Sequence, residues 1–270
     1  MALRTVLITG CSTGIGRATA LRLVRGGWEV YATARQPATL DELAAAGCHV
    51  LALDVTSEES MHAALAAIPG GVAVLINNAG YSQSGALETL PMESVRRQFE
   101  TNVFGLLRLT QLVLPGMREA RAGKIVNVSS MGGRLTLPGG GAYHATKYAV
   151  EALSDALRME VARFGIDVIC VEPGLIRTEF GATAADGVDA SGPYAAFNAS
   201  VAKSTRDVYE GPLSRLGGDA DDVARAIETA LGKPRAPSRV PVTASARLFM
   251  GLRRVLPDRA WDKVVGASLK

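Results

Sequence analysis

Tyr143 and Lys147 are the two residues whose types and spacing point most directly to chemistry. They stand four positions apart in Tyr143-His144-Ala145-Thr146-Lys147, so in a helix they share one face. An unperturbed tyrosine has a pKa of about 10, and a neighbouring ammonium favours the phenolate, which lowers that pKa. The pair predicts a general acid/base, although the pattern alone also fits two helix-surface residues.

Polar motifs follow several of the predicted strands. Asn77-Asn78-Ala79-Gly80, Ser129-Ser130 and Pro173-Gly174 each end or follow an apolar run, and Asn102 lies in a helical segment between two of them. The carboxyl ends of parallel strands meet at one edge of a sheet, where such folds bind ligands. We therefore expect these motifs to gather with Tyr143 where a nicotinamide would lie.

A glycine-rich turn follows the first predicted strand. Thr9–Gly16 contains Gly10, Gly14 and Gly16 and opens the first helix. Glycines let a backbone approach a pyrophosphate, whose charge the helix N-terminus stabilises. The segment predicts a dinucleotide site; a plain strand-to-helix turn is the alternative interpretation.

The end of the second strand indicates which dinucleotide binds. Thr33-Ala34-Arg35 carries no carboxylate for a ribose 2′-hydroxyl, and a guanidinium suits a 2′-phosphate, so NADP is predicted over NAD. An exposed arginine without a ligand is the alternative for Arg35. Asp54 and Val55 follow the third strand, where an adenine edge could be held; Asp54 could equally cap the next helix.

Alternating strands and helices must position these motifs. Six continuous apolar runs predict strands buried on both faces: 6–8, 30–32, 50–53, 72–76, 125–128 and 166–171. Five helix-length segments separate them: 16–25, 38–46, 57–67, 93–118 and 145–164. The order predicts an α/β fold with a doubly wound, Rossmann-type parallel sheet, and residues 1–270 form one predicted domain. A further helix is expected from Asp219 to about Leu231.

Composition excludes several classes of protein. The net charge of +3 on 270 residues gives no indication of nucleic-acid binding. Three scattered cysteines argue against a disulfide framework, and His49 and His62 have no partners at metal-ligand spacing, so no metal is expected. No signal peptide or transmembrane stretch is recognisable, and the expected location is cytoplasmic.

Together these motifs resemble the short-chain dehydrogenase/reductase family over roughly residues 4–178. The resemblance implies that Tyr143 is the acid/base and Ser130 polarises the substrate carbonyl. It also implies that Lys147 tunes Tyr143 and holds the nicotinamide ribose, and that Asn102 supports a water next to the lysine. Other implied cofactor contacts are Ser12, Thr13 and Ile15 at the phosphates and ribose, Asn78, Ala79 and Gly80 along the adenosine and ribose channel, Pro173 and Gly174, and Ile176 and Thr178 at the carboxamide.

The cofactor turn and second strand are similar to those of the hydroxysteroid and retinol dehydrogenase branch. The predicted function is hydride transfer between NADP(H) and a carbonyl or alcohol of a lipophilic small molecule: a steroid, a retinoid or a long-chain compound. The resemblance also implies a homo-oligomer, either a dimer or a tetramer. Two alternatives are an NADP(H)-binding sensor or scaffold without turnover, and an isomerase or dehydratase on the same fold.

The last third of the chain is predicted to form the substrate side. Residues 175–210 are expected to form a lid, and an apolar pocket suits a lipophilic substrate. Its expected walls are Leu135, Leu137, Leu175, Phe180, Tyr194 and Phe197. Residues 244–268 form a predicted helical extension whose apolar face would include Leu248 and Val255. A core-facing helix is favoured there over one that rests on a membrane or covers the substrate pocket. His144 is interpreted as a packing or surface residue.

Overall fold

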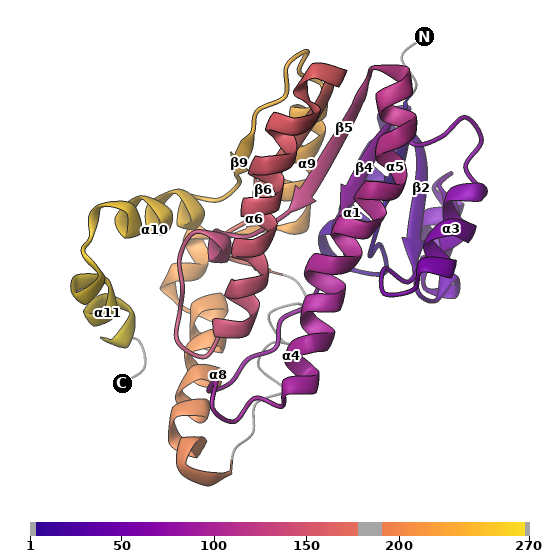
Figure 1. Ribbon diagram of the computed structural model, residues 1–270. Coiled ribbons are helices and arrows are strands. Elements are labelled where there is room, and N and C mark those ends of the chain that lie inside the picture. Colours follow the sequence, from indigo (N-terminus) through magenta and orange to yellow (C-terminus); the bar gives the residue numbers. More distant parts are fainter. Residues whose placement is uncertain (1–3, 178–190, 268–270) are drawn as a thin grey trace.

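A computed structural model describes residues 4–177 and 191–267, and its centre is a seven-stranded parallel sheet (Figure 1). The strand order is β3-β2-β1-β4-β5-β6-β9. The strands are β1 (Thr5–Ile8), β2 (Glu29–Ala34), β3 (His49–Ala52), β4 (Val74–Asn77), β5 (Gly123–Val128), β6 (Ile166–Glu172) and β9 (Arg239–Pro241). The doubly wound Rossmann-type fold in one domain is confirmed.

Helices cover both faces of this sheet. Those within the first two thirds of the chain are α1 (Gly14–Arg25), α2 (Asp41–Ala45), α3 (Glu58–Ala66), α4 (Met92–Phe99), α5 (Leu106–Ala120) and α6 (Gly141–Val161). Those that follow are α8 (Ala195–Glu210), α9 (Ala220–Leu231), α10 (Ala244–Val255) and α11 (Asp258–Gly266). A short second sheet pairs β7 (Ile176–Arg177) with β8 (Gly218–Asp219).

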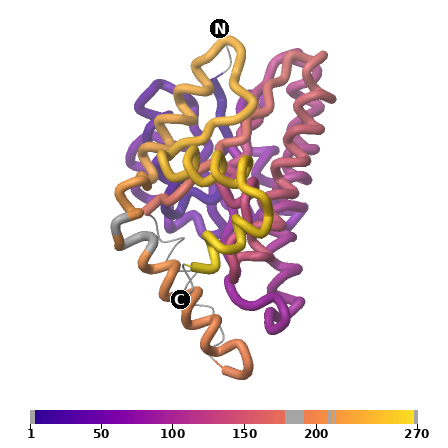
Figure 2. Tube along the Cα trace, turned by 90° about the vertical axis from the view of Figure 1, so that its left-hand side faces the viewer, coloured from indigo at the N-terminus to yellow at the C-terminus, as the bar shows by residue number. Residues whose placement is uncertain are grey.

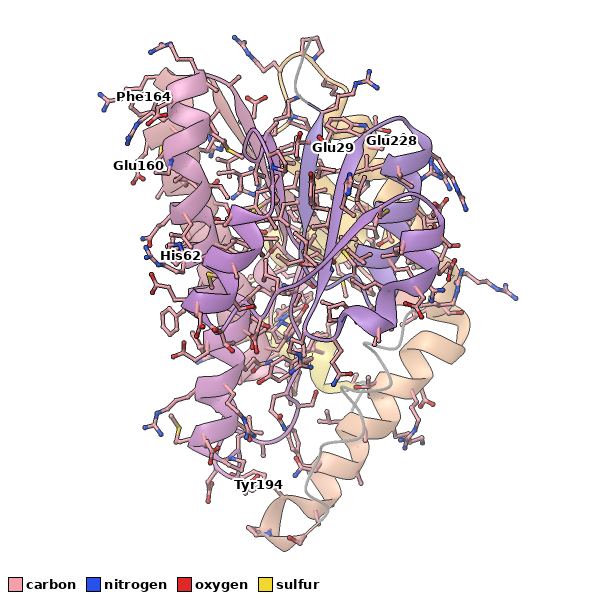
Figure 3. All side chains as sticks on the ribbon, turned by 90° about the vertical axis from the view of Figure 1, so that its right-hand side faces the viewer. Glu29, His62, Glu160, Phe164, Tyr194 and Glu228 are labelled. Carbon is pink, nitrogen blue, oxygen red and sulfur yellow. The ribbon has the colours of Figure 1, made fainter. Side chains whose placement is uncertain are left out.

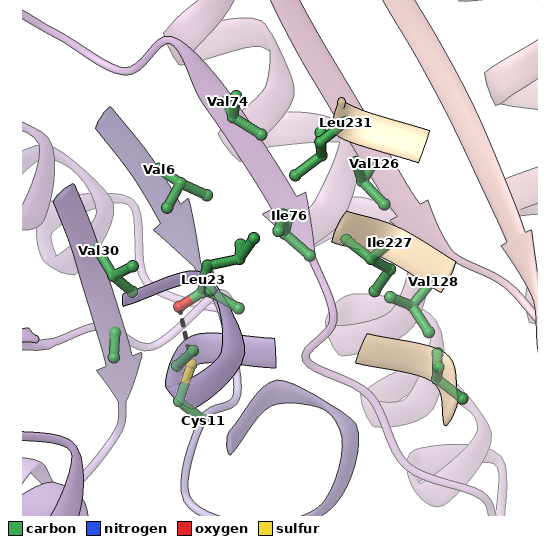
Figure 4. Close-up of a cluster of buried hydrophobic side chains, with 14 of the residues drawn as sticks. Val6, Cys11, Leu23, Val30, Val74, Ile76, Val126, Val128, Ile227 and Leu231 are labelled. Atoms are coloured by element: carbon green, nitrogen blue, oxygen red, sulfur yellow. Dashed lines mark hydrogen bonds between the residues drawn. The ribbon is translucent and has the colours of Figure 1, made fainter. Parts of the chain in front are cut away.

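Alternation along the strands divides the core into two layers. Val6 and Ile8 of β1 pack with Leu23 of α1 and Ile227 of α9 on one face, as the close-up of this cluster shows (Figure 4). Leu7, between them, packs on the other face with residues of α3 and α5. Because strand side chains point alternately to opposite faces, apolar residues at consecutive positions supply both layers.

The sheet exceeds the predicted six strands by one. β9 pairs with β6 in parallel, and α9 lies in the connection between these two strands. The strand escaped prediction because it is three residues long and ends in Pro241, a residue that suits only a sheet edge. The predicted helix at 219–231 is confirmed, with Asp219 in a capping box with Asp222.

Three predicted helices differ in detail from the structure. The segment predicted as one helix over 93–118 contains a π-helical turn, Glu100–Gly105, between α4 and α5. The helix predicted from Ala145 begins at Gly141, so Tyr143 lies in its first turn. Predicted residues 38–46 divide into a 3-10 turn, Pro37–Leu40, and the short helix α2.

The C-terminal third lies to one side and at the carboxyl edge of the sheet. In Figure 1 the strand arrows point toward the end of the molecule where α8 projects. Figure 2 faces the yellow helices α10 and α11, which lie side by side over one flank. The predicted helical stretch 245–265 is broken at Pro257, and Leu248 and Val255 are exposed at 47% and 73%. Its expected single apolar face is therefore wrong, although Phe249, Leu252 and Leu256 do pack inward.

Candidate active site

The turn between β1 and α1 has the shape of an anion cradle. Gly10 has a φ of +70° and Gly14 a φ of +57°, a left-handed backbone that favours glycine. A Cβ on Gly16 would lie 2.3 Å from the Gly10 carbonyl oxygen, so no side chain fits there. Thr13 precedes α1 without a side-chain cap, and no acidic residue lies in the first helical turn. The N-terminus of α1 thus suits a phosphate.

Asn78 holds this turn against the end of β4. Its side-chain amide donates to the carbonyl oxygens of Thr9 and Gly10, each at 2.9 Å. The Thr9 hydroxyl accepts from the backbone N–H groups of Asn78 and Ala79, each at 3.0 Å. The structure brings the first and fourth strand ends together as expected, and the Asn78 side chain itself braces the turn.

The residues predicted to contact the adenosine half end the next two strands. Arg35 directly follows β2 and is exposed, as a side chain that meets a 2′-phosphate would be. Asp54 is half-buried, and its Oδ1 accepts from the Thr56 amide at 2.9 Å and the Thr56 hydroxyl at 2.7 Å. Val55 is 7% exposed. The cap of α3 is Ser57, so Asp54 stabilises the preceding turn, and the capping alternative is wrong.

Tyr143 and Lys147 face each other on α6. The Lys147 Nζ lies 5.8 Å from the centre of the Tyr143 ring and donates to the Val128 carbonyl oxygen at 2.8 Å. Burial lowers the pKa of Lys147 to about 8, and Cys170 and Glu151 oppose that effect. The lysine is therefore mainly an ammonium at neutral pH, the form that favours a nearby phenolate.

Ser130 lies in the turn after β5, two residues beyond Val128, whose carbonyl oxygen accepts from Lys147. Its side chain accepts from the Gly132 N–H at 3.0 Å, and the Met131 N–H bonds the Pro173 carbonyl oxygen at 2.8 Å. These bonds join the ends of β5 and β6, so Ser130 and Pro173-Gly174 come to the same edge as predicted. The hydroxyl hydrogen of Ser130 remains able to donate elsewhere.

His144 supports this turn from the other side. The imidazole is 7% exposed; its Nδ1 lies 2.9 Å from the Gly132 carbonyl oxygen, and its Nε2 accepts from the Leu137 N–H at 3.2 Å. Burial lowers its pKa. His144 is thus a packing residue, as one of the two interpretations had it. α6 begins at Gly141, four residues before the predicted start at Ala145, and the bonds of His144 hold this first turn of the helix in place.

Asn102 projects from the π-helical turn toward the lysine. Its side-chain amide donates to the Tyr81 carbonyl oxygen at 2.9 Å and to the Thr146 hydroxyl at 3.1 Å. A Cβ on Gly80 would lie 3.1 Å from Asn102 Oδ1 and 3.9 Å from Lys147 Nζ. The three predicted residues are therefore neighbours, and a π turn, often found at functional sites, is what aims Asn102 there.

The β6 end of the site contains both expected and unexpected neighbours. Gly174 packs so closely that a Cβ would lie 2.2 Å from Thr243 Oγ1 and 2.4 Å from Ser245 Oγ. Ile176 begins β7 and is 5% exposed. The C-terminal segment thus supports the predicted nicotinamide end, which the sequence did not reveal. Thr178 and Phe180 lie outside the described residues.

Leu135 and Leu175 lie in a buried apolar cluster. They are 1% and 6% exposed and pack with Met131, Ala246 and Trp261 beneath α10 and α11. That both leucines contact the substrate stays a prediction, and the C-terminal helices supply their apolar partners among the described residues.

An apolar cavity of about 480 Å³ lies beside this cluster. Leu137, Tyr194 and Phe197 line it as predicted, and Leu87, Tyr148 and Trp261 are walls that sequence reasoning missed. Tyr194, labelled near α8 in Figure 3, also donates to Glu88 at 2.7 Å. Trp261 bonds the Thr136 carbonyl oxygen at 3.2 Å. Gly141, two residues before Tyr143, belongs to the same wall.

Chemically, the arrangement combines an anion cradle, an acid/base pair and an apolar cavity along one sheet edge. Over residues 4–177 and 191–267, no group of histidine, cysteine or acidic side chains could hold a metal ion. In the same ranges, no helix has the length and apolar character to cross a bilayer.

Known proteins are similar in sequence to this one over most of the chain. The uncharacterised oxidoreductase YbbO of Escherichia coli K12 is 36% identical over 267 residues, covering 97% of this chain and 94% of the relative. The NADPH-dependent 3-dehydrocapnine reductase of Ornithobacterium rhinotracheale is 31% identical over 280 residues, covering 99% and 98%. Human retinol dehydrogenase 8 is 36% identical over 251 residues, covering 87% and 80%.

Solved structures agree with the sequence relatives. A short-chain dehydrogenase from Streptomyces avermitilis superposes with a TM-score of 0.81 at 39% identity, covering 98% of each chain. One from Sphingobium yanoikuyae in complex with NADPH gives 0.71 at 29% identity, covering 97% of this chain and 92% of that one. The family model described as short chain dehydrogenase matches residues 4–189. The chain therefore belongs to the short-chain dehydrogenase family, within a branch like that of the retinol and hydroxysteroid enzymes, and is an oxidoreductase that uses a nicotinamide nucleotide.

Proposed function

We propose that this enzyme transfers a hydride between NADP(H) and a carbonyl or alcohol carbon of a lipophilic substrate. The observation that carries the proposal is the facing pair on α6, with Lys147 Nζ 5.8 Å from the Tyr143 ring centre. The pair adjoins the ends of β4 and β5, next to the cradle at the start of α1. The acid/base and the anion site thus lie along one edge, as hydride transfer to a carbonyl requires.

Each polar residue of the site has a distinct role in this proposal. Tyr143 donates the proton to the developing alkoxide or removes it from the alcohol. Ser130 donates to the substrate oxygen while its own oxygen accepts from Gly132. Lys147 stabilises the phenolate and binds the nicotinamide ribose, and Asn102 orients the polar groups next to Lys147. The nicotinamide, when bound, supplies or accepts the hydride.

The cofactor preferred in this proposal is NADP, and Arg35 is the discriminating residue. It is exposed directly after β2, where a guanidinium can form two charge-assisted bonds with a phosphate. Two of the relatives are described with NADPH. The remaining proposed contacts are Gly10, Ser12, Thr13, Gly14, Ile15 and Gly16 around the phosphates, Asp54 and Val55 at the adenine, Asn78, Ala79 and Gly80 along the ribose, and Pro173, Gly174, Ile176 and Thr178 at the nicotinamide.

Exchanging Arg35 for Asp tests that preference. The variant should lose NADPH affinity about 100-fold, a cost of roughly 3 kcal/mol, and gain affinity for NADH, because a carboxylate repels the 2′-phosphate and accepts from a 2′-hydroxyl. Fluorescence titration with both nucleotides measures this. An unchanged ratio of the two affinities would remove Arg35 from the site.

The apolar cavity supports a lipophilic substrate. Leu137, Phe197 and Trp261 give it apolar walls next to a polar reacting end. Relatives named for retinol and for 3-dehydrocapnine fit the same preference. Measuring NADPH consumption with steroid, retinoid and long-chain ketones against sugar-derived ketones tests the class. Faster turnover of the sugars would contradict it.

Replacing Tyr143 with Phe tests the reaction itself. The variant should lose turnover by at least about a thousandfold, within the range for general acid/base catalysis, yet bind NADPH nearly as the wild type does. Retention of most activity would disprove the assignment, whereas loss of NADPH binding would mean that the ring has a structural role.

A homo-oligomer, dimeric or tetrameric, is part of the proposal. Phe104 in the π turn is 51% exposed and Met159 on α6 is 69% exposed, which gives this helical flank apolar side chains that a second copy could cover. Light scattering after size exclusion measures the mass, and a strictly monomeric protein at micromolar concentration would contradict it.

A further inference from the structure

A cluster of charged side chains lies directly behind Lys147. Glu151 follows the lysine by four residues on α6, on the same helix face. Arg239, the first residue of β9, reaches this face from the edge of the sheet. Its Nε lies 3.1 Å from Glu151 Oε2 and 3.3 Å from Oε1 of Glu172, the last residue of β6. Its Nη2 lies 2.5 Å from Asp155 Oδ2.

Two of the three carboxyl groups are buried, whereas the side chains of Arg239 and Asp155 remain 26% and 40% exposed. Glu151 is 5% exposed and Glu172 is 3% exposed. The loop after β5 closes over them: a Cβ on Gly133 would lie 2.9 Å from Glu151 Cγ and 3.0 Å from the Lys147 carbonyl oxygen. Three buried oxygens that gather here form no hydrogen bond in the described structure, namely Ser129 Oγ, Glu151 Oε1 and Glu172 Oε1.

The three carboxyl groups around Arg239 are not equally stabilised as anions. Asp155 is also bound by Arg158 at 2.8 Å, and the bonds from Arg239 and Arg158 lower its pKa. Arg239 donates a hydrogen bond to Glu151 at 3.1 Å, whereas Glu172 Oε1 has no hydrogen-bond partner among the described residues. Burial raises the pKa of Glu172 to about 7, and the charge of Glu151 adds to this against Arg134 and Arg239. Glu172 is therefore the carboxyl of the three that is hardest to ionise.

Glu151 lies one helical turn from Lys147 on the same face of α6, and both side chains are buried. The two groups that counter the burial of the lysine are Cys170 and Glu151. Burial raises the pKa of the Cys170 thiol to about 12, so Cys170 is uncharged at neutral pH. Glu151 is therefore the acidic side chain whose charge can counter the burial of Lys147.

We propose that Glu151 is a positioning residue for the acid/base pair: its carboxylate, oriented by Arg239, keeps the proton on the buried Lys147 ammonium. Glu172, the carboxyl that burial makes hardest to ionise, does not take over this role. Without Glu151 the buried amine releases its proton near neutral pH, and a neutral amine no longer favours the Tyr143 phenolate. The inference rests on the proposed function for its catalytic meaning.

The pKa of Lys147 can be measured directly, by NMR titration of protein with ¹³C-labelled lysine side chains. The signal of Lys147 is the one lost in Lys147→Arg. The other lysines of the chain are Lys124, Lys203, Lys233, Lys263 and Lys270. Glu151→Gln, which keeps the shape of the side chain and removes its charge, should lower the pKa of Lys147 by at least about one unit, a tenfold change in proton affinity.

Three further variants separate charge from structure. Glu172→Gln alters the same buried cluster but copies a protonated carboxyl, so it should leave the pKa of Lys147 within about 0.3 units of the wild type on this argument. Glu160→Gln, at the exposed far end of α6 (Figure 3), should change nothing. Glu151→Asp keeps the charge but opens a cavity, and should lower the pKa of Lys147 less than Glu151→Gln does.

The order of these shifts decides the proposal. Equal shifts in Glu151→Gln and Glu172→Gln, no shift in Glu151→Gln, or a larger shift in Glu151→Asp would each overturn it. If Glu151→Gln does not fold, Glu151→Asp and Glu172→Gln still decide: the proposal fails if either shifts Lys147 by a full unit. The titration needs neither substrate nor turnover. A Tyr143→Phe variant that retained activity would therefore remove the proposed function without changing this result.

Discussion

The proposed cofactor site of this enzyme is formed mainly by backbone atoms, whereas the proposed substrate site is formed mainly by side chains. Around the cradle at β1 and α1, backbone atoms approach so closely that a Cβ on Gly16 would lie 2.3 Å from a carbonyl oxygen. Around the cavity under α10 and α11, contacts are made by side chains such as Trp261 and Phe249. Gly251, within α10, has open space where a Cβ would be.

This difference has consequences for both regions. A cradle made of backbone groups binds a phosphate whatever the neighbouring side chains are, and it tolerates no added atom. A wall made of apolar side chains can change its shape with each substitution while the sheet beneath stays folded. The same chemistry can therefore be kept at one end of the site while the substrate changes at the other.

Gly16→Ala should produce the largest effect on NADPH affinity. The added methyl would collide with Gly10, which costs about 1–3 kcal/mol of folding stability and displaces the N–H groups of the cradle. We expect NADPH affinity to fall at least about 100-fold, as measured by fluorescence titration. Gly251→Ala is the matched control and should raise stability by about 0.5–1 kcal/mol, because alanine favours a helix interior. Equal losses of NADPH affinity in the two variants would show that the effect of Gly16→Ala is not specific to the cradle.

Trp261→Ala should be the next largest effect, and it should be local. The indole is 4% exposed, bonds the Thr136 carbonyl oxygen at 3.2 Å and lies 6.0 Å from the Arg253 guanidinium carbon. Removing a buried tryptophan costs about 3–5 kcal/mol, which we expect to release α11 while the sheet stays folded. Limited proteolysis should cut residues 256–266 faster, with NADPH affinity within about twofold of the wild type. Val264→Ala, on the exposed face of α11, is the control.

A loss of NADPH binding in Trp261→Ala as large as that in Gly16→Ala would show that the two sides are one cooperative unit. Such a result would contradict the expectation that the C-terminal helices can change without affecting the cofactor site.

Glu172→Gln should give the smallest effect. Glu172 is the last residue of β6 and lies between the two regions. The pKa of this carboxyl is raised from 4.5 to about 7 by burial and by Glu151, so the folded state binds the proton more tightly than the unfolded state. Its contribution to stability is present below pH 4.5 and is lost as the pH rises to 7. The variant should therefore be more stable than the wild type above pH 7, by on the order of 1–3 kcal/mol.

Urea unfolding at pH 5 and pH 8 measures this difference, with Glu160→Gln as an exposed control. A change of equal size at both pH values would mean that Glu172 contributes by packing and not by titration.

Much of the site was predictable because it depends on local spacing. The four-residue separation of Tyr143 and Lys147 places both on one helix face in any helix, and Gly10, Gly14 and Gly16 follow a strand in the way a phosphate turn requires. Apolar runs predicted six of the seven strands of the central sheet, since strands covered on both faces need continuous hydrophobic residues. The family resemblance pointed to the same positions.

The substrate side was less predictable because it depends on contacts between distant segments. Leu135 and Leu175 share a buried cluster with Trp261, more than 80 positions along the chain, and no local pattern indicated this contact. The short strand β9 forms only because β6 offers it an edge. Glu151 and Glu172 are unremarkable in the sequence and become a coupled pair only when Arg239 is brought between them.

The sequence by itself determined the family, the doubly wound sheet and the spacing of the proposed acid/base pair, because each follows from periodicity or from spacing within a few residues. Only the tertiary structure decided which side chains line the cavity, how the C-terminal segment packs against Gly174, and which charged groups gather behind Lys147. Those features depend on burial and on distances between segments far apart in the chain, and a linear pattern does not encode them locally.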